Sequence, residues 1–132
     1  MLDKSTICAV STAPGVGGIA VIRVSGPEAL PVALRLFRCG GETPVAESVK
    51  PRYAYYGEVI AGDELVDEVV LTYFRAPHSF TGEDTVEISC HGSVYIRRRL
   101  LECLVGEGCQ MAQPGEFTRR AYLNGRMDLS SA

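Results

Sequence analysis

The chain has 132 residues, of which 46% are hydrophobic and 22% are charged, which is typical of one globular domain. The net charge of -3 is uneven, because residues 1–93 carry 7 basic and 12 acidic side chains and residues 94–132 carry 6 and 4. A general nucleic-acid binder is usually more basic, and no apolar run indicates a membrane span or a secretory leader, so we expect a cytoplasmic protein.

The five cysteines are odd in number and contain no pair at CxxC spacing. A chain of this size also needs no covalent staple. We therefore expect reduced thiols that act as small buried hydrophobic groups. They are Cys8, Cys39, Cys90, Cys103 and Cys109.

The N-terminal part is predicted to form two strands and a helix. Ile7–Val10 and Ile19–Ser25 are rich in strand-forming residues, and the glycines of Ala13–Gly18 indicate a tight turn between them. Alternation places Arg23 on the same face as apolar residues, near the end of its strand. Apolar residues at helical spacing then predict a helix over Pro27–Arg38.

Strand and helix signals continue to Asn124-Gly125, which is typical of a left-handed helix cap. The resulting order, β-β-α-β-β-β-α-β-α, predicts an α+β fold with a mixed, mostly antiparallel sheet and helices packed on it. The later elements are the strands Arg52–Ile60, Leu65–Phe74 and Thr85–Cys90, the helix Val94–Val105, a short strand in Cys109–Ala112 and the helix Pro114–Leu123.

The last residues suggest that the sequence is part of a longer protein. Asp128 would be a good N-cap for a further helix that the chain does not contain. We therefore expect additional chain beyond Ala132.

Neither a nucleotide-hydrolysis site nor a zinc site has its usual sequence pattern in this chain. The glycines of Ala13–Gly18 resemble a phosphate loop, but no Gly-Lys-Ser/Thr triplet supplies the lysine and the magnesium ligand, so we expect no nucleotide hydrolysis here. His78, Cys90 and His91 are badly spaced for zinc, and neighbouring strand residues point to opposite faces.

Three charged residues are candidates for ligand binding. Glu87 lies near the end of a strand, where its carboxylate can accept two parallel hydrogen bonds from an amino group and a ring N–H. Arg23 and Arg126 suit bidentate recognition of carboxylates. On spacing alone, however, an exposed strand glutamate and surface ion pairs explain the same residues.

Three segments together resemble one known family. They are Gly17–Gly26, Phe80–Gly92 and Pro114–Leu129. In this order, and across nearly the whole chain, they are similar to the N-terminal domain of the tRNA modification GTPases MnmE, also called TrmE.

The resemblance implies a fold like the folate-binding domain of aminomethyltransferases and a constitutive homodimer. It implies a bound tetrahydrofolate derivative, in the 5-formyl or the 5,10-methylene form, contacted by Arg23, Glu87 and Arg126. Residues 1–118 would form the folate-binding and dimerisation domain, and residues 119–132 would begin a helical domain. Members often have Gly-Gly where this chain has Gly92-Ser93, and lysine where it has Arg126.

The same resemblance implies further properties of the whole protein. It would hydrolyse GTP in a separate G domain that uses magnesium and potassium. With an FAD-dependent partner, MnmG (GidA), it would modify C5 of the wobble uridine in tRNA. This part of the chain would position the one-carbon carrier and would not be an enzyme by itself.

Two other interpretations remain open. The chain could be a stand-alone folate-dependent protein of the aminomethyltransferase type. It could also be an RNA-binding module that uses Arg97–Arg99 and Arg119-Arg120.

Overall fold

The protein folds around one seven-stranded sheet with the order β3-β4-β5-β6-β2-β1-β7. The computed structural model describes residues 4–12 and 18–125. The expected turn at residues 13–17, Arg126 and Asp128 lie outside these described residues.

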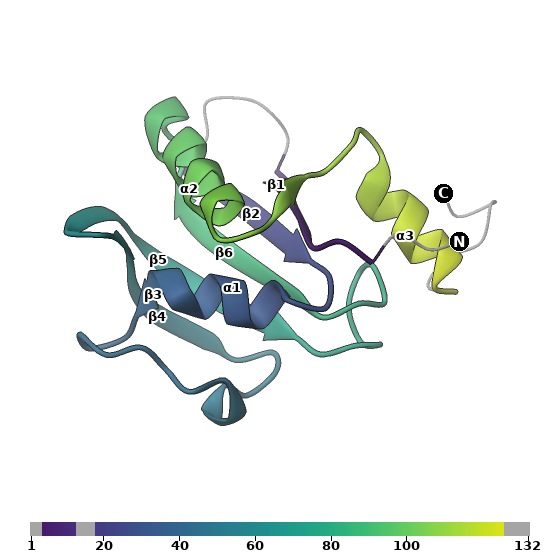
Figure 1. The fold of residues 1–132 in the computed structure, drawn as a ribbon, viewed down its shortest axis with the longest axis horizontal. Coiled ribbons are helices and arrows are strands. Elements are labelled where there is room, and N and C mark those ends of the chain that lie inside the picture. Colours follow the sequence, from purple (N-terminus) through teal and green to yellow (C-terminus); the bar gives the residue numbers. More distant parts are fainter. Residues whose placement is uncertain (1–3, 13–17, 126–132) are drawn as a thin grey trace.

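Figure 1 shows the elements in chain order, with longer loops between β3 and β4 and between β5 and β6. Every strand pair is antiparallel except β1 with β7. The strands are β1 Ile7–Val10, β2 Ile19–Ser25, β3 Phe37–Arg38, β4 Ala54–Ala61, β5 Glu64–Phe74, β6 Thr85–His91 and β7 Gln110–Met111; the helices are α1 Ala29–Leu36, the 3-10 turn η1 Ala46–Ser48, α2 Val94–Gly106 and α3 Glu116–Leu123. The predicted α+β class with a mixed, mostly antiparallel sheet is confirmed.

Alternation along the strands separates a buried face of the sheet from an open one. On β2, Ala20, Ile22 and Val24 are buried, whereas Val21 and Arg23 are half-buried on the other side. The register carries this division into β6 and β5, so the buried apolar core gathers between the sheet and the helices α1 and α2. Burial of this apolar layer is the main force that stabilises the fold.

Helices α1 and α2 lie over the same face of the sheet, whereas α3 stands apart beyond the β1 side (Figure 1). The stripes of α1 and α2 complete the core with the sheet. Helix α2 begins at Ser93, whose Oγ accepts a hydrogen bond of 3.1 Å from the backbone N–H of Ile96. Ser93 therefore caps the helix in the way its position after Gly92 suggests.

The expected helix Pro27–Arg38 is wrong at its C-terminal end. The helix stops at Leu36, because Phe37 adopts an extended conformation and pairs with Val59 of β4. A Cβ atom on Gly57 would lie 2.5 Å from the Phe37 ring. The absent side chain at Gly57 thus makes room for Phe37 to leave the helix and join the sheet.

The expected domain boundary between residues 118 and 119 falls inside α3, which runs without a break from Glu116 to Leu123. The boundary itself stays a prediction. Across the described parts of the chain, no helix is long and apolar enough to span a lipid bilayer.

Candidate functional site

Two of the three predicted site residues meet on the open face of the sheet. Arg23 of β2 and Glu87 of β6 are direct partners in the antiparallel register. The Glu87 Oε2 atom accepts from Arg23 Nε at 3.1 Å and lies 3.1 Å from Nη2. Their side chains are 18% and 29% exposed, so the pair is accessible without being freely solvated.

Two aromatic rings flank the guanidinium of Arg23. Its Cζ lies 4.6 Å from the ring centre of Phe80 and 5.3 Å from that of Phe117. Both distances are within the range of favourable cation–π contacts. The rings come from the loop before β6 and from α3, so segments far apart in the sequence converge on one strand residue.

Beside this cluster lies a recess of about 380 Å³. Its size is at the lower end of the range for small-molecule sites. Arg23, Phe80 and Phe117 belong to its wall, and the rest is supplied by β1 and by the segment that leads into α3. The recess thus combines apolar rings with a charged group at one side.

The buried guanidinium of Arg120, which is 1% exposed, holds α3 in this position. Arg120 Nη1 donates to the backbone carbonyl of Ser5 at 2.7 Å and to the Glu83 carboxylate at 3.2 Å. Its Nη2 donates to Glu116 at 3.0 Å. Because two carboxylates balance the buried charge, the clamp ties α3 to the chain before β1 and to the loop before β6.

Hydroxyl groups fix the loop that carries Phe80. The Oγ of Ser25 lies 2.7 Å from Thr81 Oγ1 and donates to Glu83 at 2.8 Å. Asn124, at the end of α3, donates to the carbonyl of Thr81 at 3.0 Å. The loop that carries Phe80 and the end of α3 are therefore joined by hydrogen bonds.

Sequence reasoning placed Arg23 and Glu87 as candidates but did not identify Phe80, Phe117 or Arg120 as parts of the same cluster. An aromatic residue next to glycine or threonine in a loop is an accessible signal, and Phe80 fits it. No local sequence pattern predicts that Phe117 belongs to the cluster, because its position beside Arg23 depends on where α3 docks. Arg126 lies outside the described residues, so its placement stays a prediction.

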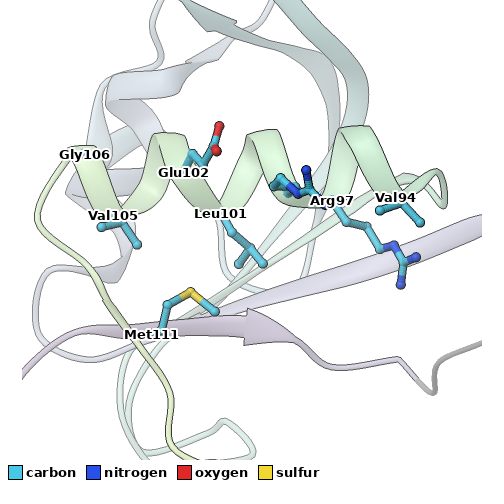
Figure 2. A pocket seen from close by; sticks show the side chains of 8 residues that line it. Val94, Arg97, Leu101, Glu102, Val105, Gly106 and Met111 are labelled. Carbon is cyan, nitrogen blue, oxygen red and sulfur yellow. The ribbon is translucent and has the colours of Figure 1, made fainter.

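Burial and ion pairing remove one arginine from each of the two proposed basic patches, Arg97–Arg99 and Arg119-Arg120. Arg120 is buried and clamped, so it cannot contact RNA phosphates in this fold. Arg99 is paired with Glu64 at 3.0 Å. Arg97 and Arg98 line a groove along α2 instead (Figure 2).

Cys90 and His91 lie on opposite sides of the sheet, as the alternation predicted. Cys90 is buried in the core, and burial raises the pKa of its thiol to about 11. His91 is exposed and its Nδ1 lies 2.7 Å from Asp67. No cluster of three or more metal-ligating side chains occurs among residues 4–12 and 18–125.

The chain is similar in sequence to known proteins along almost its entire length. The family described as "GTP-binding protein TrmE N-terminus" matches residues 6–126. Three proteins named tRNA modification GTPase MnmE are similar: that of Porphyromonas gingivalis is 66% identical over 130 residues, covering 98% of this chain and 27% of that protein. Those of Bacteroides thetaiotaomicron and Enterococcus faecalis are 50% and 47% identical, each over 99% of this chain and 28% of their own length.

The chain thus spans little more than a quarter of the length of these curated relatives. The family match covers far more than half of its residues, including every strand and helix described above. The chain therefore belongs to the family of the GTP-binding protein TrmE N-terminus.

Proposed function

We propose that this chain binds a tetrahydrofolate derivative at the cluster of Arg23, Glu87, Phe80 and Phe117, and that it forms a homodimer. The single observation that supports the site is the Arg23–Glu87 pair, which lies on an open sheet face and is flanked by two aromatic rings. Both Arg23 contacts use Oε2 of Glu87. A ligand that approaches Oε1 does not have to break them.

The chemistry of the cluster fits a pterin. A flat ring can lie against an aromatic side chain, and its amino group and neighbouring ring N–H can donate to one carboxylate. Arg23 supplies a cation for a polar or anionic part of the ligand. The recess of about 380 Å³ accommodates one ring system of this size, and Arg126 would add a second cation.

The role of the whole protein is part of the same proposal. The chain would present the one-carbon carrier, in the 5-formyl or 5,10-methylene form, within a cytoplasmic tRNA modification GTPase. The G domain, with GTP, magnesium and potassium, would lie elsewhere in that protein. Together with an FAD-dependent partner, MnmG, the protein would modify C5 of the wobble uridine in tRNA. Holding the carrier near its acceptor is catalysis by proximity.

The RNA-binding and aminomethyltransferase interpretations each predict a different experimental result. An RNA-binding module would have to rely on Arg97, Arg98 and Arg119, because Arg120 is buried and Arg99 is paired. It would show tRNA binding by this chain that weakens steeply with salt. A stand-alone aminomethyltransferase would catalyse one-carbon transfer without further domains.

Calorimetric titration with 5-formyltetrahydrofolate tests the site. We expect saturable binding by the chain and a loss of more than about 100-fold in affinity for Glu87→Ala, because two hydrogen bonds to a charged acceptor disappear. The matched control is Glu58→Ala, which removes a half-buried glutamate from β4 of the same sheet and should leave affinity unchanged.

Circular dichroism establishes that each variant is folded. A folded Glu87→Ala chain that binds like the parent would show that Glu87 is not a folate ligand. A folded parent chain that does not bind at all would remove the folate proposal for these 132 residues. Sedimentation at micromolar concentration tests the homodimer independently, and a monomer there would contradict it.

A further inference from the structure

Helix α3 is docked on the rest of the described chain mainly by polar groups. Its buried residues are Glu116, Arg120 and Ala121. None of the residues of α3, all of which the structure describes, belongs to the hydrophobic core that joins the sheet to α1 and α2. Tyr122 and Leu123 are 41% and 44% exposed. Apolar burial, which stabilises the sheet, therefore contributes little to the docking of α3.

One guanidinium lies at the centre of these polar contacts. Arg120 donates to the backbone carbonyl of Ser5 at 2.7 Å and to the Oγ of the same serine at 3.1 Å. It also donates to the carboxylates of Glu83 at 3.2 Å and Glu116 at 3.0 Å. Glu116 in turn accepts from the backbone N–H of Gln113 at 2.8 Å, which fixes the turn that leads into α3. The clamp thus uses a planar fork of several N–H donors, which arginine has and the compact ammonium of lysine lacks.

Arg120 stays outside the recess that α3 helps to form. Its side chain is buried, and it is not among the described residues that line the recess of about 380 Å³. Phe117, three residues earlier on the same helix, does line the recess, and its ring centre lies 5.3 Å from Arg23 Cζ. Residues 113–118 supply this wall. Undocking of α3 would therefore remove one wall of the recess while the pair of Arg23 with Glu87, which joins β2 to β6, could remain.

Docking of α3 and occupation of the recess are coupled by mass action. A chain in which α3 is docked for only a fraction of the time binds ligand with an affinity reduced by that fraction, because the wall has to form first. Conversely, a ligand that contacts Phe117 binds the docked state more tightly and shifts the chain toward it. Since the hydrophobic core contains no residue of α3, undocking is a local opening and leaves the sheet intact.

We propose that Arg120 is a positioning residue of the folate cluster: its clamp docks α3, completes the recess and thereby sets the affinity for the ligand. The proposal rests on the folate site proposed above and adds how that site is assembled. It also makes α3 the segment whose docking responds to occupation of the site.

Titration with 5-formyltetrahydrofolate measures the effect of the clamp on binding. Arg120→Lys keeps the positive charge but loses the fork, and we expect at least about tenfold weaker binding because α3 is docked for a smaller fraction of the time. The matched control is Arg119→Lys, the same substitution at the neighbouring exposed residue, which should stay within about twofold of the parent. Binding like that of the parent by a folded Arg120→Lys chain would overturn the proposal.

A double-mutant cycle with Phe117 distinguishes positioning from a general loss of stability. Phe117→Ala removes the ring that α3 presents to the ligand. Because Arg120 acts through the placement of that ring, adding Arg120→Lys to Phe117→Ala should weaken binding by no more than about threefold further. Fully additive effects of the two substitutions would show that Arg120 does not act through Phe117.

Hydrogen exchange tests the docking itself. In Arg120→Lys the amides of α3 should exchange at least about tenfold faster than in the parent, whereas those of α2 should not change, because the core holds α2 in place. Saturating 5-formyltetrahydrofolate should slow exchange in α3 again. Equal exchange of α3 in the two chains would contradict the clamp, and exchange that the bound ligand does not slow would contradict the coupling.

A second variant covers the case in which Arg120→Lys fails to fold. Asn124→Ala removes the hydrogen bond of 3.0 Å that the Asn124 side chain donates to the carbonyl of Thr81, and it leaves the guanidinium in place. It should show the same pattern with a smaller effect, about threefold in affinity and in exchange of α3. Parent-like values of both in this variant would overturn the proposal.

The outcomes separate this proposal from the folate site itself. A parent chain that binds, a Glu87→Ala chain that does not and an Arg120→Lys chain that binds like the parent would overturn the role of Arg120 alone. A parent chain that does not bind 5-formyltetrahydrofolate would overturn both proposals.

Discussion

Arg120 illustrates how a single side chain can acquire a role that its sequence position does not indicate. In the sequence it is one of two adjacent arginines in a polar helix. In the structure its guanidinium is buried between Glu83 and Glu116, where truncation would leave two carboxylates without their cation. Burial of this charge is tolerated because the two carboxylates pair with it and accept its hydrogen bonds.

The thiols give a residue-scale prediction. Cys39 is exposed, whereas the other four cysteines are buried. Burial raises the pKa of Cys90 and Cys103, and the thiolate is the reactive form. We expect a thiol reagent such as dithionitrobenzoate to modify one cysteine per native chain rapidly and the others only after denaturation.

The Cys39→Ser variant should lose the rapid phase and keep the slow one. Two or more rapid equivalents in the native parent would show that a buried thiol is accessible. Mass spectrometry of the modified chain identifies which cysteine reacted.

At the level of single elements, the sequence predicted type and order well because periodicity and turn residues are local properties. The strands β1 and β2 have the predicted bounds, and Gly125 takes the expected positive φ of 76° after α3. The two-residue strand β3 was not predicted, since it depends on the space that Gly57 leaves for Phe37 across the sheet. Tertiary contact there overrides a continuous helical pattern.

The candidate site was predictable only in part for the same reason. Strand alternation placed Arg23 on a face shared with apolar residues near the end of its strand, and Glu87 near the end of another strand. Pairing of β2 with β6 brings the two into one register. The approach of Phe117 requires the docking of α3, which is set by a clamp over more than a hundred residues of sequence. No local pattern contains that information.

Helix α2 supplies the element-scale prediction. Ser93→Ala removes the acceptor for the Ile96 N–H and should lower the free energy of unfolding by about 1 kcal/mol. Ser93→Asp keeps an acceptor at the N-terminus of the helix and should stay close to the parent. Chemical denaturation followed by circular dichroism measures both.

Equal stabilities for the Ala and Asp variants would show that the cap contributes nothing measurable. In that case the beginning of α2 would be fixed by the burial of Leu100 and Leu104 alone.

The stability of the whole molecule should depend on pH in the alkaline range. Burial, aided by the negative charge of Asp67, raises the pKa of Cys90 from 9.0 to about 11. Its folded pKa exceeds the unfolded one, so this contribution to stability is fully present below pH 9 and is lost as pH rises toward 11. Over that window the free energy of unfolding should fall by about 1.4 kcal/mol per pH unit for this one proton.

Urea titrations between pH 8 and 10.5 measure this slope, and Cys90→Ala should make it shallower even if the variant is less stable throughout. The pKa of Cys8 is also raised, by its hydrogen bond with Cys109 and by burial, and acts in the same direction. Identical slopes for the parent and Cys90→Ala would rule out Cys90 as the source.

The clamp at Arg120 also has a topological consequence. Its guanidinium joins residue 5 to residue 120 through a 2.7 Å hydrogen bond, so the beginning and the end of the folded unit are neighbours in space. A short linker between residues near Ser5 and Arg120 would therefore close the backbone, and the same sheet does not require its strands to follow one another in their present chain order. A permuted polypeptide, opened at the β4–β5 turn and closed by a short linker near Ser5, would keep the same sheet while moving the newly created ends away from Arg23, Phe80 and Phe117.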